Sequence, residues 1–210
     1  MKITKYAHSC ILIETDERVG LFDPGNYSWD LFNIDNLNRL DDILITHEHA
    51  DHMYLPFVKA LTEKFPDAHI TTTESAANIL REAGIVNVAF ENNQYVTLFS
   101  ADHESMEPLS SVPLTNKGIH YLDVFTSPGD SHHFSETKKI LALPVTAPWG
   151  TTARAAEIIE ELKPEYVIPI HDWLWRDDVC QRFYEIMSNF CNKQGVKFLQ
   201  PINGQSIDIQ

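Results

Sequence analysis

The stretch that decides the fold of this chain is Ile43-Leu44-Ile45-Thr46-His47-Glu48-His49-Ala50-Asp51-His52. Its apolar start predicts a buried strand over residues 41–46, and three histidines and two carboxylates follow within six residues. Side chains two positions apart in extended backbone point the same way, so His47 and His49 can converge on one ion. Asp51 and His52 come after the chain turns and can reach a second point nearby. Because zinc, manganese and iron share imidazole and carboxylate ligands, we favour a metal site over a polar loop of solvated histidines.

The elements around this motif are predicted to alternate irregularly between strands and helices. Residues 9–14 and 19–23 form an expected hairpin that leads into Asp23-Pro24-Gly25, and a helix over residues 53–65 follows the motif. Further strands are expected over residues 69–72, 86–90, 95–100, 119–126, 139–143, 166–170, 197–199 and 206–209. Further helices are expected over residues 74–83, 151–162 and 177–193, the second capped by Thr151 or Thr152. Consecutive strands without helices favour two sheets covered by helices, and the lack of a linker predicts a single domain over residues 1–210.

The composition is that of an acidic chain with enough apolar residues for a core. Of its 210 residues 43% are hydrophobic, so it needs no disulfide to fold. The 16 Lys and Arg against 30 Asp and Glu give a charge of −14, which argues against binding nucleic acid or anionic membranes. No signal peptide is recognisable, and no apolar run approaches the roughly 18 residues of a membrane span. Three cysteines without a CxxC pattern favour a reducing cytoplasm.

The segment from His47 to His52 resembles the HxHxDH signature of the metallo-β-lactamase superfamily. That family continues with a third histidine after a later strand, an aspartate after a glycine, and a last histidine after a late strand. His103, Asp130 in Ser127-Pro128-Gly129-Asp130, and His171 stand in this order. Taken singly, each of these three residues has an alternative as a structural residue at a strand end, and their joint occurrence in this order favours the ligand interpretation.

The amino terminus resembles one subgroup of that family. His8-Ser9-Cys10, followed by apolar residues and Leu21-Phe22-Asp23-Pro24-Gly25, is similar to the L-ascorbate-6-phosphate lactonases and related small metal-dependent hydrolases. The resemblance implies an α/β fold, specifically a four-layer αββα sandwich of two mixed β-sheets flanked by helices. It also implies two divalent metal ions, zinc or manganese in the first place, with iron also accepted. One ion would be held by His47, His49 and His103, the other by Asp51, His52 and His171, with Asp130 bridging both.

Such a pair of ions explains why these residue types are useful together. Two divalent cations about 3.5–4 Å apart can share a water and lower its pKa toward neutrality. The metal-bridging hydroxide can attack a carbonyl or phosphoryl centre without a protein nucleophile, and the sequence has no GxSxG elbow or Walker-type loop. Asp51 and Asp130 are expected to be catalytic chiefly as ligands, with proton transfer as a second role.

Four other residues are candidates for contacts with the ligands or the substrate. Asp23 can accept a hydrogen bond from a metal-bound imidazole, or it can simply form the Asp-Pro-Gly turn. The subgroup resemblance suggests that His8 lies at the mouth of the site, although a structural role fits it as well. His132 and His133 depart from the family's commoner Gly-Asp-Thr pattern. They either touch substrate, tune Asp130, or are exposed loop residues.

The predicted function is therefore a cytoplasmic metal-dependent hydrolase acting on a small-molecule ester, lactone or phosphoester. One alternative is a phosphodiesterase or nuclease of the same superfamily, which the low basic content disfavours. The other is a noncatalytic metal-binding protein. A small molecule is the expected partner, nucleic acid and membranes are not, and a homo-oligomer is compatible with the sequence.

Overall fold

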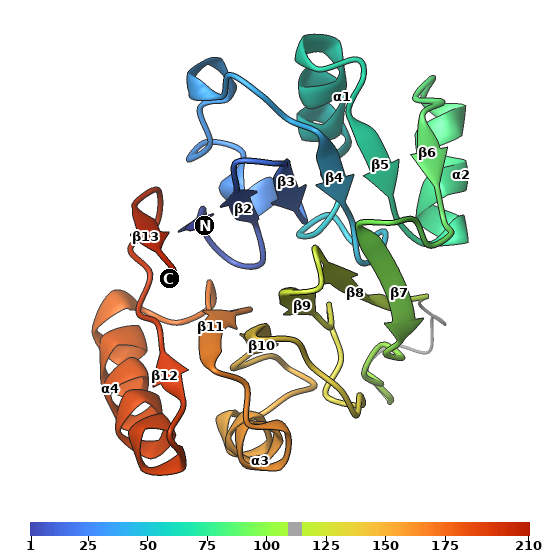
Figure 1. Cartoon of the computed structure of the whole chain (residues 1–210). Helices are drawn as coiled ribbons and strands as arrows, with labels where there is room; N and C mark the ends of the chain where they lie inside the picture. The colour runs from blue at the N-terminus through green and yellow to red at the C-terminus, as the bar shows by residue number, and fades with distance from the viewer. Residues whose placement is uncertain (109–114) are drawn as a thin grey trace. The chain divides into compact units, whose positions relative to one another are not determined.

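The strand that leads into the histidine motif, β4 (Asp42–Leu44), lies inside the first of two mixed β-sheets in a computed structural model of the chain (Figure 1). The structure describes residues 1–108 and 115–210. The chain divides into two compact units, unit 1 of Met1–Glu91 with Pro201–Gln210 and unit 2 of Asn92–Gln200. Within the described residues each unit carries one mixed sheet and two α-helices, so the predicted α/β fold with two mixed sheets is confirmed. That one domain spans residues 1–210 stays a prediction.

The sheet of unit 1 is antiparallel on one side and parallel on the other. Its strands lie in the order β13 (Ser206–Asp208), β1 (Lys2–Lys5), β2 (Ile11–Glu14), β3 (Val19–Phe22), β4, β5 (His69–Thr71) and β6 (Val88–Ala89). Pairing is antiparallel from β13 to β3 and parallel from β3 to β6. The carboxyl ends of β3, β4 and β5 therefore meet at one edge of the sheet, and the histidine motif begins at that edge.

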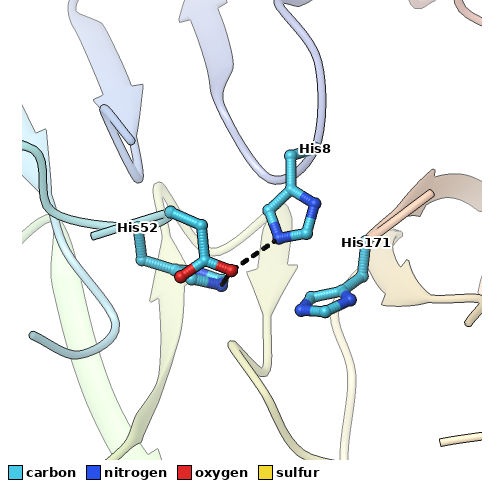
Figure 2. Close-up of side chains that lie close together, drawn as sticks. His8, His52 and His171 are labelled. Carbon is cyan, nitrogen blue, oxygen red and sulfur yellow. Dashed lines mark ion pairs between the residues drawn. The ribbon is translucent and has the colours of Figure 1, made fainter. Parts of the chain in front are cut away.

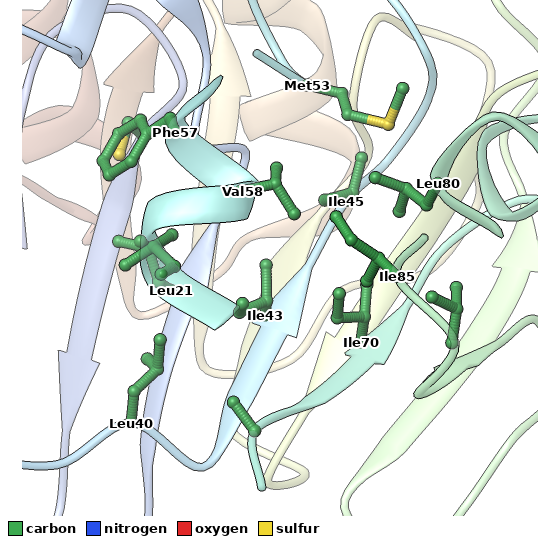
Figure 3. Packing of buried hydrophobic residues seen from close by; sticks show 14 of the residues in the cluster. Leu21, Leu40, Ile43, Ile45, Met53, Phe57, Val58, Ile70, Leu80 and Ile85 are labelled. Atoms are coloured by element: carbon green, nitrogen blue, oxygen red, sulfur yellow. The ribbon is translucent and has the colours of Figure 1, made fainter. Parts of the chain in front are cut away.

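Two helices of unit 1 pack on one face of this sheet. Alternation along the motif strand directs Ile43 and Ile45 to that face, where they join Phe57 and Val58 of α1 (Leu55–Lys64) in a buried cluster (Figure 3). Helix α2 (Glu74–Glu82) begins where the Thr73 side chain accepts a hydrogen bond from a backbone N–H of its first turn. Short 3-10 turns, η1 (Asn26–Ser28) and η2 (Ile34–Asn36), connect β3 to β4.

The sheet of unit 2 has the same mixture of pairings. Its order is β12 (Lys197–Phe198), β11 (Tyr166–Ile170), β10 (Ile140–Pro144), β9 (Phe125–Ser127), β8 (Lys117–Tyr121) and β7 (Val96–Ser100). Strands β9 to β12 are parallel, and β8 runs antiparallel to both β7 and β9. Strands β7, β9, β10 and β11 therefore all end at the same edge, which sets up the second group of candidate ligands.

Helices α3 (Thr152–Leu162) and α4 (Asp177–Gln194) pack on this second sheet. Leu143 and Val167 from the sheet, Ile159 from α3 and Met187 from α4 belong to one buried cluster. The predicted cap is confirmed, because the Thr151 side chain accepts a hydrogen bond from the Arg154 N–H at 3.1 Å. None of the helices in the described part of the chain combines the length and apolarity that a membrane crossing requires.

One predicted element was wrong. The apolar run over residues 119–126 is not a single strand but the hairpin of β8 and β9. Leu122 and Asp123 form its tight turn, each with a φ of +53°. Hairpin turns with such positive φ values usually contain Asn-Gly or Asp-Gly. Because this turn contains neither, the sequence did not predict it.

A second difference is strand β1, which the sequence did not predict. Residues Lys2–Lys5 show no apolar alternation, yet they pair with β2 on one side and β13 on the other. Pairing with distant strands, rather than local pattern, makes this segment extended.

The β8–β9 turn generates a prediction about stability. Leucine in the left-handed region costs roughly 1–2 kcal/mol, whereas asparagine adopts that region readily. Leu122 is half-buried, so some apolar packing would be lost. We expect Leu122→Asn to raise the free energy of unfolding in urea by about 1 kcal/mol. The control is Leu31→Asn at an exposed leucine that is not among the positive-φ residues, where no gain is expected. An equal fall in the free energy of unfolding in both variants would contradict the backbone strain ascribed to Leu122.

Candidate metal-binding site

Asp23 connects the ends of two neighbouring parallel strands in unit 1. Its backbone N–H donates to the Leu44 carbonyl at 2.8 Å, just beyond β3. The fully buried carboxylate accepts a hydrogen bond from the Thr46 N–H through Oδ1 (2.8 Å), and its Oδ2 lies 3.0 Å from His52 Nδ1. The pKa of Asp23 is raised, because the effect of burial exceeds the opposing effects of the His52 ring and the Thr46 hydrogen bonds. With Nδ1 facing Asp23, Nε2 is the nitrogen of His52 that would bind a metal ion.

The Asp-Pro-Gly turn that contains Asp23 also packs closely against the loop of the histidine motif. A Cβ atom on Gly25 would lie 1.7 Å from the Asp51 carbonyl oxygen, so only glycine permits this approach. The Asn26 N–H donates to the Ala50 carbonyl at 2.8 Å, and the Tyr54 N–H donates to the Pro24 carbonyl at 3.0 Å. These contacts fix the loop on both sides of Asp51.

His47 and His49 project to the same side, as their spacing predicted. His47 is fully buried, with its Nδ1 3.1 Å from Thr46 Oγ1 and its Nε2 3.0 Å from His49 Nδ1. Glu48 lies between them in sequence and takes another direction, because Ser75 Oγ at the start of α2 donates to Glu48 Oε2 at 2.9 Å. Two imidazole nitrogens thus meet while the intervening carboxylate is bound elsewhere.

His8 reaches the motif from the other end of unit 1. Its Nε2 lies 3.1 Å from Asp51 Oδ2, the ion pair drawn as a dashed line in Figure 2, and its side chain is only 2% exposed. One ligand atom from each of His8, Asp51 and His52 lies within 4.8 Å of the others. The His8 ring also packs edge-on against Tyr27 at 5.2 Å. Unit 1 therefore offers a buried imidazole beyond the three of the motif.

A strained turn carries His8, and the end of the chain supports it. Ala7 and His8 have φ values of +84° and +49°, which are unfavourable for residues with a Cβ atom. The Ala7 N–H donates to Asn203 Oδ1 at 3.0 Å, and the Gly204 N–H donates to the Lys5 carbonyl at 2.8 Å. The segment before β13 thus holds the turn in this conformation.

In unit 2 three residues from three different strand ends converge. His103 follows β7, Asp130 follows β9, and His171 comes directly after β11 with a φ of +62°. Asp130 Oδ2 lies 3.5 Å from His103 Nε2 and 3.3 Å from His171 Nε2, and all three side chains are at most 5% exposed. The shared edge of the parallel strands brings these residues together although they are far apart in the sequence.

The hydrogen bonds of the two rings indicate which nitrogen carries the proton. His103 Nδ1 lies 2.7 Å from the Glu104 carbonyl oxygen, and His171 Nδ1 lies 2.9 Å from the Thr146 carbonyl oxygen. A carbonyl oxygen only accepts, so Nδ1 holds the hydrogen and Nε2 of the neutral ring presents a lone pair. Two lone pairs and a carboxylate oxygen then face one another, which is a donor set that fits a divalent cation.

Two polar residues link the loops that carry His103 and Asp130. The buried Asn116 amide donates to the Ala101 carbonyl (2.6 Å) and the Pro128 carbonyl (2.8 Å), and its Oδ1 accepts from the Asp130 N–H (3.2 Å). Glu104 makes further contacts between the same loops. Neither residue was predicted to play this role, because an isolated Asn or Glu carries no local signal for such a bridge.

His132 and His133 differ from each other in their surroundings. His132 is buried, its Nε2 lies 2.9 Å from the Pro144 carbonyl oxygen, and burial lowers its pKa. Its ring packs edge-on against Trp149, whose ring also lies 5.1 Å from that of His171. His133 has a side chain that is 75% exposed and contacts Glu104. The exposed-loop interpretation therefore fits His133 and not His132.

The structure thus brings the candidate residues together in two groups. In unit 1 they are His8, Asp23, His47, His49, Asp51 and His52. In unit 2 they are His103, Asp130 and His171, with His132 packed beside Trp149. Thr46, Asn116, Glu104 and Asn203 support these groups and were not anticipated.

Comparisons with known proteins identify the family and the fold. A family model described as a beta-lactamase superfamily domain matches residues 2–171. Protein Rv0786c of Mycobacterium tuberculosis is 28% identical over 201 residues, covering 88% of this chain and 90% of that protein. The metallo-beta-lactamase fold protein YhfI of Bacillus subtilis has a TM-score of 0.71 at 15% identity, covering 98% of both chains. An isothiocyanate hydrolase from Delia radicum gut bacteria has a TM-score of 0.68 at 17% identity, covering 100% of this chain and 99% of that chain.

The support of the His8 turn can be tested at Asn203. Asn203→Ala removes the acceptor for the Ala7 N–H, so we expect the free energy of unfolding to fall by about 1 kcal/mol. We also expect faster modification of His8 by diethyl pyrocarbonate, measured by mass spectrometry. Asn203→Asp keeps an oxygen at this position and serves as the control. Unchanged protection of His8 in Asn203→Ala would show that the turn does not depend on this bond.

Proposed function

Because the chain belongs to the beta-lactamase superfamily, we propose that it is a metal-dependent hydrolase of a small-molecule ester, lactone or phosphoester. The observation that carries the proposal is the convergence of His103 and His171 on one carboxylate oxygen of Asp130. The HxHxDH segment supplies a second set of imidazoles and a carboxylate, of which His47 and His52 are buried. Both sets consist of the ligand types that divalent transition metals bind.

The ligand assignment rests on family membership, on the order of the motifs, and on the geometry inside each unit. One ion is assigned to three histidines, the other to two histidines and an aspartate, and Asp130 to both. The first set is His47, His49 and His103, and the second is Asp51, His52 and His171. Zinc or manganese is the proposed metal, and iron suits the same donors.

A pair of divalent ions would supply Lewis acidity toward a carbonyl or phosphoryl oxygen and would lower the pKa of a water. The residues of the chain do the remaining work. Asp23 accepts a hydrogen bond from His52 Nδ1, so that Nε2 is the nitrogen that would bind a metal ion. The Thr146 carbonyl has the same effect on His171. His8 lies beside Asp51 and can hold or release a proton at its Nε2 atom. Cys10 is not a nucleophile, because burial raises the pKa of its thiol to about 12.

The substrate class is proposed from sequence motifs and charge. A lactone is proposed first because His8-Ser9-Cys10 and the Asp-Pro-Gly turn resemble those of the lactonase subgroup. The isothiocyanate hydrolase of similar fold acts on another small electrophile, which is consistent with a small-molecule substrate. The charge of −14 disfavours a nucleic-acid substrate, since such binding depends on neutralising phosphates with Lys and Arg.

Metal content is the first test. We expect about two divalent ions per chain in protein purified without chelator, measured by plasma mass spectrometry. Asp130→Ala should lose bound metal because it removes a ligand proposed for both ions. His69→Ala is the matched control, since His69 lies in β5 and contacts Asn87 rather than the motif. A protein that contains no metal, and takes up none when zinc or manganese is added, would refute the proposal.

Turnover is the second test. We expect hydrolysis within a panel of lactones, phosphodiesters and β-lactams, with the lactones cleaved best. His49→Ala and Asp130→Ala should each abolish turnover and leave the circular dichroism spectrum near that of the unaltered protein. Retained activity in both variants would remove these residues from the mechanism. A metal-loaded protein that is inactive on the whole panel would favour a noncatalytic metal-binding role.

A further inference from the structure

Glu104 uses all three of its polar groups in the part of unit 2 that carries the candidate ligands. Its carbonyl oxygen accepts from His103 Nδ1 at 2.7 Å. Its backbone N–H donates to the Asp130 carbonyl at 2.9 Å. Its carboxylate accepts from the His132 backbone N–H at 2.7 Å. Glu104 therefore contacts the ring of one proposed ligand, His103, and the backbone on the carboxyl-terminal side of another, Asp130.

We propose that Glu104 is a positioning residue that holds His103 and Asp130 at the separation needed to bind a metal ion. This inference rests on the proposed function, because it assigns a role within the same site. Two of the Glu104 contacts are made by the backbone and survive substitution. The carboxylate contacts with the His132 N–H and the His133 ring depend on the side chain, and they can be removed without the backbone contacts.

The need for this contact follows from how the backbone around Asp130 is restrained. On the amino-terminal side, the Asp130 N–H donates to Asn116 Oδ1 at 3.2 Å. On the carboxyl-terminal side, the Asp130 carbonyl and the His132 N–H are both bound by Glu104. Asn116 and Glu104 thus act on opposite sides of Asp130. Without the Glu104 carboxylate, the His132 N–H loses its acceptor, while the backbone bond between Glu104 and Asp130 and the contact of the His132 ring with the Pro144 carbonyl remain.

The function of the Glu104 side chain is to accept a hydrogen bond rather than to carry charge. Its side chain is 13% exposed, and its shortest contact is with a neutral backbone N–H. The contact with the His133 ring is at 2.9 Å, but that ring is 75% exposed and solvent weakens the interaction. An acceptor of the same size and no charge should therefore replace the carboxylate.

The experiment compares Glu104→Gln with Glu104→Met. The two side chains have similar length, but only glutamine retains an oxygen that accepts from the His132 N–H. Zinc affinity is measured by competition with a chromophoric chelator, and amide exchange at residue 132 is measured by NMR on metal-free protein. We expect Glu104→Met to bind zinc about 10–100-fold more weakly and to exchange the residue 132 amide faster. We expect Glu104→Gln to behave like the unaltered protein in both measurements.

The control is Glu136→Ala in the same unit, whose 66% exposed side chain faces His120 instead of the ligand loops. It should leave zinc affinity unchanged. Equal zinc affinity in Glu104→Met and the unaltered protein, or equal weakening in Glu104→Gln and Glu104→Met, would overturn the positioning role alone. Failure of the unaltered protein to bind zinc would overturn the proposed function as well. Should Glu104→Met not fold, Glu104→Ala takes its place in the comparison.

Discussion

The approach of two imidazole nitrogens to one carboxylate oxygen is the arrangement on which the candidate site depends. His103 and His171 present Nε2 atoms within 3.5 Å of Asp130 Oδ2, and each ring is oriented by a carbonyl oxygen at its Nδ1. Electron-rich atoms repel one another at such distances unless a cation lies among them. The surrounding backbone must therefore impose the arrangement, and the parallel strands of unit 2 do so by ending at one edge.

Backbone strain accompanies the candidate residues in both units. His8, Asp23 and His171 all have positive φ values although none is glycine. Such conformations cost free energy and persist only where other contacts enforce them. The ladder bond to Leu44 enforces that of Asp23, and the bond between Asn203 and Ala7 supports that of His8. At these positions the contacts of the fold offset the cost of the strained backbone, and the side chains are held in fixed orientations.

Much of this could be predicted because the decisive signals are local. The buried strand before His47, the convergence of His47 with His49, and the helix cap at Thr151 each depend on residues close in sequence. The β8–β9 turn was missed because Leu122 and Asp123 lack the usual turn residues. Asn116 and Asn203 were missed for a different reason. Their bonds join segments that are adjacent only after the sheets have formed, and no spacing rule indicates them.

The family match ends at residue 171, yet the last ten residues belong to unit 1 and add an edge strand to its sheet. Strand β13 covers the backbone of β1 through register partners such as Ile3 and Ile207. Expression of a chain truncated at the family boundary would leave β1 with unsatisfied N–H and C=O groups along its outer side. Exposed strand edges of this kind template intermolecular pairing, so the trimmed chain would be prone to aggregate even with every proposed ligand intact.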